Sequence, residues 1–161
     1  MNKTVAVASY IGKGKLFNSL VRNWDNTDIS HTELVLNVHD NDILQSWSSS
    51  FMDGGVRGKS IKLNPENWLI VEIPITNDEY KFIIDHIDKT RGLKYDVLGV
   101  FTNSIGAVSN NKQKWFCNEW VGAALQIMEP HRYRPASFHN IAQRLSYERR
   151  NWEHERMGIL L

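Results

Sequence analysis

A chain of 161 residues and 18.6 kDa fits one domain of ordinary size and is long enough to bury a hydrophobic core. Nineteen Lys and Arg residues against eighteen Asp and Glu residues leave a formal charge of +1, which excludes a polycationic protein that wraps nucleic acid. The single cysteine, Cys117, excludes an internal disulfide and a zinc site built from a pair of cysteines.

The first half of the chain is predicted to form mainly strands. β-Branched residues at alternate positions indicate a strand near the N-terminus, and the Asx-rich turn 39–42 predicts a hairpin between the strands that flank it. One short amphipathic helix is expected over residues 17–24. The predicted strands cover residues 4–10, 31–38, 43–47, 59–63 and 68–73, and Pro74 ends the last of them.

The second half of the chain is predicted to be helical. Gly92 stops the first of these helices, Pro130 follows the end of the third, and Ser137 caps the last. The predicted helices cover residues 77–90, 95–107, 117–128 and 137–147. Because the strands cluster early and the helices late, we expect an α+β fold in which a mostly antiparallel sheet packs on helices.

No repeat, low-complexity tract or linker divides the chain, so we expect a single domain over residues 1–161 with a charged C-terminal tail over 149–161. The absence of any run of 18 apolar residues predicts no transmembrane segment. The apolar stretch 5–11 is too short, and too soon followed by the Gly- and Lys-containing residues 12–15, to resemble a signal peptide. We therefore expect a cytoplasmic protein with no metal or other cofactor and no specific nucleic-acid partner.

Cys117 is the first candidate for a chemical role, because it stands at the start of a predicted helix. A helix N-terminus presents unpaired N–H groups and a partial positive charge, and both favour the thiolate, which is the nucleophilic form. The alternative is a structural cysteine, since free cysteines are among the most buried residues.

A thiol nucleophile also needs a base, and six histidines are available. His31 begins a predicted strand, where a sheet can present a side chain at its rim. His139 opens the last predicted helix and is the second candidate. The other four histidines stand in a turn, in a helix or among charged residues, which are ordinary settings for this residue.

Two segments resemble the reactive motifs of a known family. SHTELVL over residues 30–36, followed after a polar turn by ILQS over 43–46, looks like the histidine hairpin of the NlpC-like papain-fold hydrolases. FCNEWV over 116–121 resembles their cysteine at a helix start. The histidine precedes the cysteine, as in the circularly permuted, YiiX-like branch, whose relatives include lecithin:retinol acyltransferase-type proteins. Further similar segments are YIGKG over 10–14, GGVR over 54–57 and YD over 95–96, and the likeness covers roughly residues 5–145.

This resemblance implies a papain-like fold and a role for each motif residue. His31 takes the proton of Cys117, and a polar residue on the neighbouring strand orients the imidazole. Gln45 is the expected orienter, with Ser46 and Ser48 as alternatives if the strand register is shifted. Tyr95 and Glu33 are candidates for the oxyanion or substrate site, and Glu33 stands where such hairpins usually carry glycine.

The activity implied by the resemblance is that of a cysteine-dependent hydrolase of amide or ester bonds acting through a thioester acyl-enzyme. A peptidase, an amidase and an acyltransferase are all compatible with this chemistry. The substrate is a peptide, a peptidoglycan-like peptide or a lipid acyl group. The alternative is a non-catalytic binding module that uses the same groove.

Overall fold

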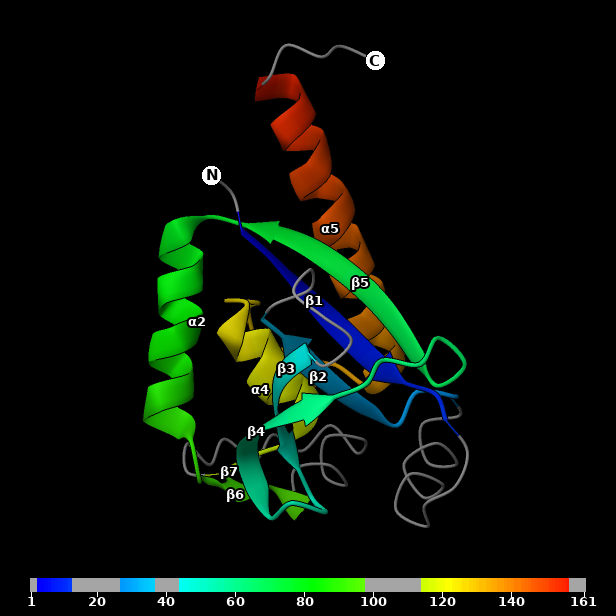
Figure 1. Cartoon of the computed structure of the whole chain (residues 1–161), viewed down its shortest axis with the longest axis vertical. Coiled ribbons are helices and arrows are strands. Elements are labelled where there is room, and N and C mark those ends of the chain that lie inside the picture. The colour runs from blue at the N-terminus through cyan, green and yellow to red at the C-terminus, as the bar shows by residue number, and fades with distance from the viewer. Residues whose placement is uncertain (1–2, 13–26, 37–43, 98–113, 157–161) are drawn as a thin grey trace.

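The structure is a computed structural model that describes residues 3–12, 27–36, 44–97 and 114–156 (Figure 1). Within these residues the fold is α+β, with one curled seven-stranded sheet and helices packed on it. The strands are β1 (Lys3–Tyr10), β2 (His31–Val35), β3 (Leu44–Ser50), β4 (Gly55–Ile61), β5 (Trp68–Ile75), β6 (Lys94–Tyr95) and β7 (Lys114–Trp115). They lie side by side in the order β5-β1-β2-β3-β4-β6-β7. All neighbouring pairs are antiparallel except β6 and β7, which confirms the expected sheet type.

Successive side chains of each strand point to opposite faces of the sheet, and buried apolar residues therefore form a core on each face. On one face, Val5 and Val7 join a large buried cluster that also contains residues of each of the described α-helices. On the other face, Ala6, Ala8 and Val35 form a smaller cluster. The face with the small cluster is the one that also carries His31, because this residue has the same parity as Val35 on β2.

Three α-helices cover the larger core: α2 (Asn77–Thr90), α4 (Cys117–Ala124) and α5 (Pro135–Arg156). Helix α2 begins with a capping box, in which Thr76 and Glu79 bond each other's backbone N–H groups. Helix α4 lies against β2 and β3, and its Trp120 is fully buried. A short 3-10 helix, η1 (Pro130–Arg132), connects α4 to α5. No helix among the described residues is long and apolar enough to cross a membrane.

Several predicted boundaries were wrong. Pro74 lies inside β5, which tolerates it because β5 is an edge strand. Residue 95 belongs to strand β6 rather than to a helix. Helix α4 stops before residue 128 because Gln126 adopts a left-handed backbone conformation, with φ 57°.

The charged tail also differs from the prediction, because α5 continues as a helix to Arg156. Ser146 and Arg149 donate hydrogen bonds to backbone carbonyls of β5, and Arg149 pairs with Glu79. Ser137 is not the N-cap residue of α5, which begins two residues earlier at Pro135; its hydroxyl instead accepts from the Arg134 N–H at 3.0 Å. The predicted helix 17–24 and turn 39–42, and residues 98–107 of the predicted helix 95–107, lie outside the described residues.

Candidate active site

Cys117 is the first residue of α4, as predicted, and is 6% exposed. The strand β7 leads directly into it, and Ser49 on β3 anchors that strand by donating a hydrogen bond of 2.6 Å to the Trp115 carbonyl oxygen. The Glu119 carboxylate accepts from the Phe116 N–H at 3.4 Å and so closes the helix N-terminus. The sulfur is therefore held at the end of a rigid element rather than on a free loop.

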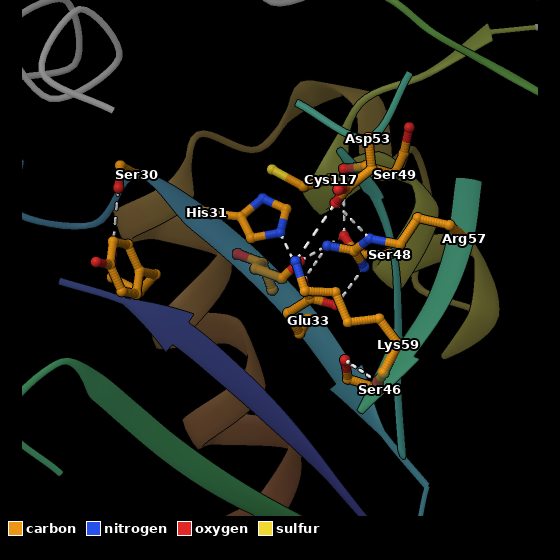
Figure 2. A network of polar contacts seen from close by, with 12 residues as sticks. Ser30, His31, Glu33, Ser46, Ser48, Ser49, Asp53, Arg57, Lys59 and Cys117 are labelled. Carbon is orange, nitrogen blue, oxygen red and sulfur yellow. Dashed lines mark hydrogen bonds and ion pairs between the residues drawn. The ribbon is translucent and has the colours of Figure 1, made fainter. Parts of the chain in front are cut away.

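His31 is the first residue of β2 and hydrogen-bonds Cys117 through their side chains. Its Nε2 lies 2.8 Å from Glu33 Oε1, which leaves Nδ1 as the ring nitrogen for the sulfur. Figure 2 shows the imidazole between the Cys117 sulfur and the Glu33 carboxylate. The structure thus brings together the sequence-predicted Cys117 and His31, and it adds Glu33 as the third member of the chain of contacts.

The charges in this chain of contacts support one another. Burial lowers the pKa of His31, but the hydrogen bonds and negative charges of Cys117 and Glu33 outweigh it and raise the pKa from 6.5 to about 9. Burial likewise raises the pKa of Glu33, yet the His31 and Arg57 contacts lower it from 4.5 to about 2. An imidazolium beside a carboxylate is therefore the stable pairing at neutral pH.

Arg57 on β4 also holds the Glu33 carboxylate and shares its Oε1 with His31. Its Nη1 donates to Glu33 Oε2 at 2.8 Å and its Nη2 donates to Glu33 Oε1 at 2.6 Å, a bidentate pair. Its Nε donates to Asp53 Oδ2 at 2.7 Å. Burial alone raises the pKa of Asp53, but this contact and Lys59 lower it from 3.8 to about 2. Arg57 thus fixes the carboxylate that orients His31, a role that was not predicted from the sequence.

The small side chains of β3 explain how residues of β2 and β4 meet across it. Ser46 pairs with Lys59, and Ser48 pairs with Arg57, so each long side chain of β4 extends over a serine. Ser48 itself donates to the Thr32 carbonyl at 2.6 Å, and Ser46 to the Lys59 carbonyl at 3.0 Å. These serines are therefore engaged with backbone carbonyls and do not orient the imidazole, contrary to the alternatives considered from the sequence.

Gln45 does not lie beside His31, so its expected role as the orienter was wrong. The backbone carbonyl of Gln45 accepts from Leu36 N, which places Gln45 opposite Leu36, five residues along β2 from His31. Its side chain is exposed. Glu33 takes its place because residues i and i+2 of a strand share one face.

Tyr95 lies near the sulfur. Burial, followed by the negative charge at Cys117 and that of Asp96, raises the pKa of the Tyr95 phenol well above 10.0, so its hydroxyl stays protonated. Its ring packs edge-on against Phe51, with centroids 5.8 Å apart. Glu33, the other residue expected at the oxyanion or substrate site, is instead bound by His31 and Arg57.

His139, the second candidate base, is occupied elsewhere. Its Nδ1 lies 2.9 Å from Ser9 Oγ, a fully buried hydroxyl on β1. Burial lowers the pKa of His139, which is the environment of a neutral structural histidine. His86, in α2, is half-buried, and its ring contacts Trp115 and Trp120.

Asn118 completes the surroundings of the sulfur, and no sequence signal pointed to it. Its Oδ1 accepts from Thr32 Oγ1 at 2.8 Å and lies 3.5 Å from the Cys117 sulfur. Its Nδ2 donates to the Tyr133 carbonyl at 3.4 Å. The Thr32 bond ties the first turn of α4 to β2, and the Tyr133 bond ties it to the end of η1.

A cavity of about 230 Å³ opens on His31 and is bordered by both aromatic and charged side chains. No three His, Cys, Asp or Glu side chains within the described part of the chain are grouped so that they could hold a metal ion.

A scan against protein-family models finds no match, and no curated protein matches the chain. The family relationship expected from the motifs therefore stays a prediction.

Proposed function

We propose that this protein is a cysteine-dependent hydrolase of amide or ester bonds that forms a thioester on Cys117. The observation that carries the proposal is the unbroken chain of side-chain contacts from Cys117 through His31 to Glu33. A nucleophile, a base and a group that orients the base are the three parts that covalent acyl transfer needs. The buried bidentate Arg57 contact keeps the third part in place.

In the first half of the reaction, the proton of the Cys117 thiol is already held on Nδ1 of the His31 imidazolium, and the thiolate attacks the substrate carbonyl carbon. The carbon–sulfur bond forms while the carbonyl π electrons move onto oxygen. The backbone N–H of Cys117, in the first turn of α4 where N–H groups have no acceptor within the helix, stabilises this oxyanion. The Tyr95 hydroxyl, which is protonated and close to the sulfur, supplies a second donor.

In the second half, the imidazolium gives its proton to the leaving amine or alcohol as the bond to that group breaks. A water molecule then enters, His31 takes one of its protons, and the hydroxide formed attacks the thioester carbon. The thiolate leaves and the carboxylic acid is released. Throughout these steps Glu33 stabilises the cationic form of His31 and keeps Nδ1 directed at the sulfur.

The motif order supports a papain-like, circularly permuted NlpC-type assignment within this proposal. The histidine lies on the second strand of the sheet, and the cysteine comes later on a helix that packs against that sheet. Peptides, peptidoglycan-like peptides and lipid acyl groups are the substrate classes that the resemblance suggests. An acyltransferase would use the same intermediate with an acceptor other than water.

The test uses p-nitrophenyl acetate as an activated acyl donor. The proposal expects one acetyl group on Cys117 by intact-protein and peptide mass spectrometry, and none in Cys117→Ala. His31→Ala should acylate on the order of 10²-fold more slowly, whereas His139→Ala serves as the matched histidine control. Acetylation that persists in Cys117→Ala, or none at all in the wild-type protein, would leave the binding-module alternative.

A further inference from the structure

The cavity beside His31 has a wall of aromatic rings and a charged end. Tyr10 and Trp68 pack edge-on on one side, with ring centroids 5.0 Å apart, and Phe51 contacts Tyr95 in the same way on the other. The charged end comes from β2, β4 and the loop between β3 and β4. Cys117 is not among the lining side chains, but His31, which hydrogen-bonds the sulfur, is, so a substrate held in the cavity lies beside the reactive contact.

Besides the His31 imidazolium, two cationic side chains line the charged end, and they differ in how their donors are used. Arg57 is 15% exposed, and both its terminal nitrogens and its Nε donate to carboxylates at 2.6 to 2.8 Å. Lys59 is 49% exposed, and its Nζ approaches Asp53 Oδ2 only to 3.6 Å. That distance is longer than a hydrogen bond, and the same oxygen already accepts from Arg57. Lys59 is therefore the most exposed of the three cationic side chains of the cavity.

We propose that Lys59 binds an anionic group of the substrate, a carboxylate or a phosphate, while the neighbouring acyl carbon is presented to Cys117. This inference rests on the proposed function, since it assigns a substrate feature to the same site. Figure 2 shows the Lys59 side chain extending along the face that carries His31 and Glu33. Lys59 reaches this face because it stands two residues after Arg57 on β4.

When Lys59 turns from Asp53 to an anionic ligand, the carboxylates around it keep their other partners. When the Lys59 ammonium turns to a ligand, Asp53 keeps the hydrogen bond from Arg57 at 2.7 Å. Glu33 keeps both Arg57 and His31. A neutral substrate would leave Lys59 with only its long contact to Asp53, so an anion gains an interaction that a neutral analogue lacks.

The test compares matched alkylating probes that differ in one charge. N-Iodoacetylglycine carries a carboxylate, and N-iodoacetylglycinamide is its neutral partner; the β-alanine and γ-aminobutyrate homologues vary the distance of the carboxylate from the sulfur. A phosphate pair, N-iodoacetylethanolamine and its phosphate ester, distinguishes the two kinds of anion. The readout is the second-order rate constant for alkylation of Cys117 by the anionic probe divided by that for its neutral partner. Because every variant compared keeps His31, any attraction of the anionic probe by His31 affects this ratio equally in all of them.

We expect Lys59→Met to lower this ratio about fivefold for at least one spacer, and Lys59→Arg to retain it. Lys62→Met is the control for general surface charge, because Lys62 is exposed and lies outside the cavity. Added salt should lower the ratio in the wild-type protein more than in Lys59→Met. The anion with the larger dependence on Lys59 identifies the class of substrate.

An equal ratio in wild type and Lys59→Met for every spacer and both anions overturns the inference, and so does an equal fall in Lys62→Met. The ratio can be measured whether labelling is fast or slow, so it decides the inference alone. The absolute rate with the neutral probe, and its loss in His31→Ala, decides the proposed function separately.

Discussion

Replacing Glu33 by Gln removes one negative charge from the site and nearly preserves the shape of the side chain. Glu33 is 2% exposed and lies 2.8 Å from His31 Nε2, so the change acts on a buried contact. In the wild-type protein the pKa of His31 is about 9 against the ordinary 6.5. This difference corresponds to about 3 kcal/mol in favour of the imidazolium, shared between Cys117 and Glu33.

Glu33→Gln therefore lowers the pKa of His31 by about one to two units, because the charge that opposes burial is lost from one side of the ring. Arg57 keeps Asp53 but loses its bidentate partner, and the unfolding free energy at neutral pH falls by about 3 kcal/mol. The acylation rate falls with it, since the imidazole is no longer held by an anion.

The assay is an NMR titration of the imidazole C–H signals, with His31 assigned from the His31→Ala spectrum. Asp53→Asn is the matched control, because it removes the other carboxylate of Arg57 without touching His31. A pKa of His31 that moves by less than a few tenths in Glu33→Gln would refute the orienting role of Glu33. A shift equal to that in Asp53→Asn would show an unspecific charge effect.

Three further outcomes follow from the contacts. Gln45→Ala should leave the acylation rate within about twofold, since its side chain is exposed far from the site, and a tenfold loss would restore it as the orienter. Burial lowers the pKa of His86 to about 4, so its contribution to stability is present above pH 6.5 and is lost as the pH falls towards 4. In urea titrations, the unfolding free energy of His86→Phe should therefore change with pH by up to about 3 kcal/mol less than that of the wild-type protein. An equal change with pH in the two proteins would contradict this. Asn118→Ala should lower the unfolding free energy by about 2 kcal/mol, because Thr32 and the Tyr133 carbonyl lose a buried partner, and an unchanged denaturant midpoint would oppose it.

The two ends of the reactive contact could be predicted because each depends on local sequence. A cysteine before an apolar helical repeat starts a helix, and a histidine before alternating apolar residues starts a strand. The shared face of His31 and Glu33 was also predictable, since strand side chains repeat every two residues. A hairpin closed at residues 39–42 already places Gln45 opposite Leu36, so the register itself argued against Gln45.

The contact between Glu33 and Arg57 could not be found in this way. The predicted strand began at residue 59, which left Arg57 in a loop, whereas β4 begins at Gly55. Gly55 has φ 151°, and a Cβ there would lie 2.0 Å from the Leu93 carbonyl oxygen, so a tertiary contact determines where β4 starts.

The length of the last helix also depends on tertiary contacts. The charged residues after 148 stay helical because β5 and α2 bind them, and the helix propensity of these residues does not reveal such contacts.

The most direct test of the central claim is the rate of iodoacetamide alkylation of Cys117 between about pH 5 and about pH 9. An ordinary thiol is only a few per cent ionised at neutral pH. A helix N-terminus stabilises the negative charge of a thiolate by only roughly 0.3–1 kcal/mol. We expect His31→Ala to lower the rate at pH 7 about tenfold or more, and His139→Ala to keep the wild-type profile. Fast alkylation that survives in His31→Ala but disappears in His139→Ala would contradict it.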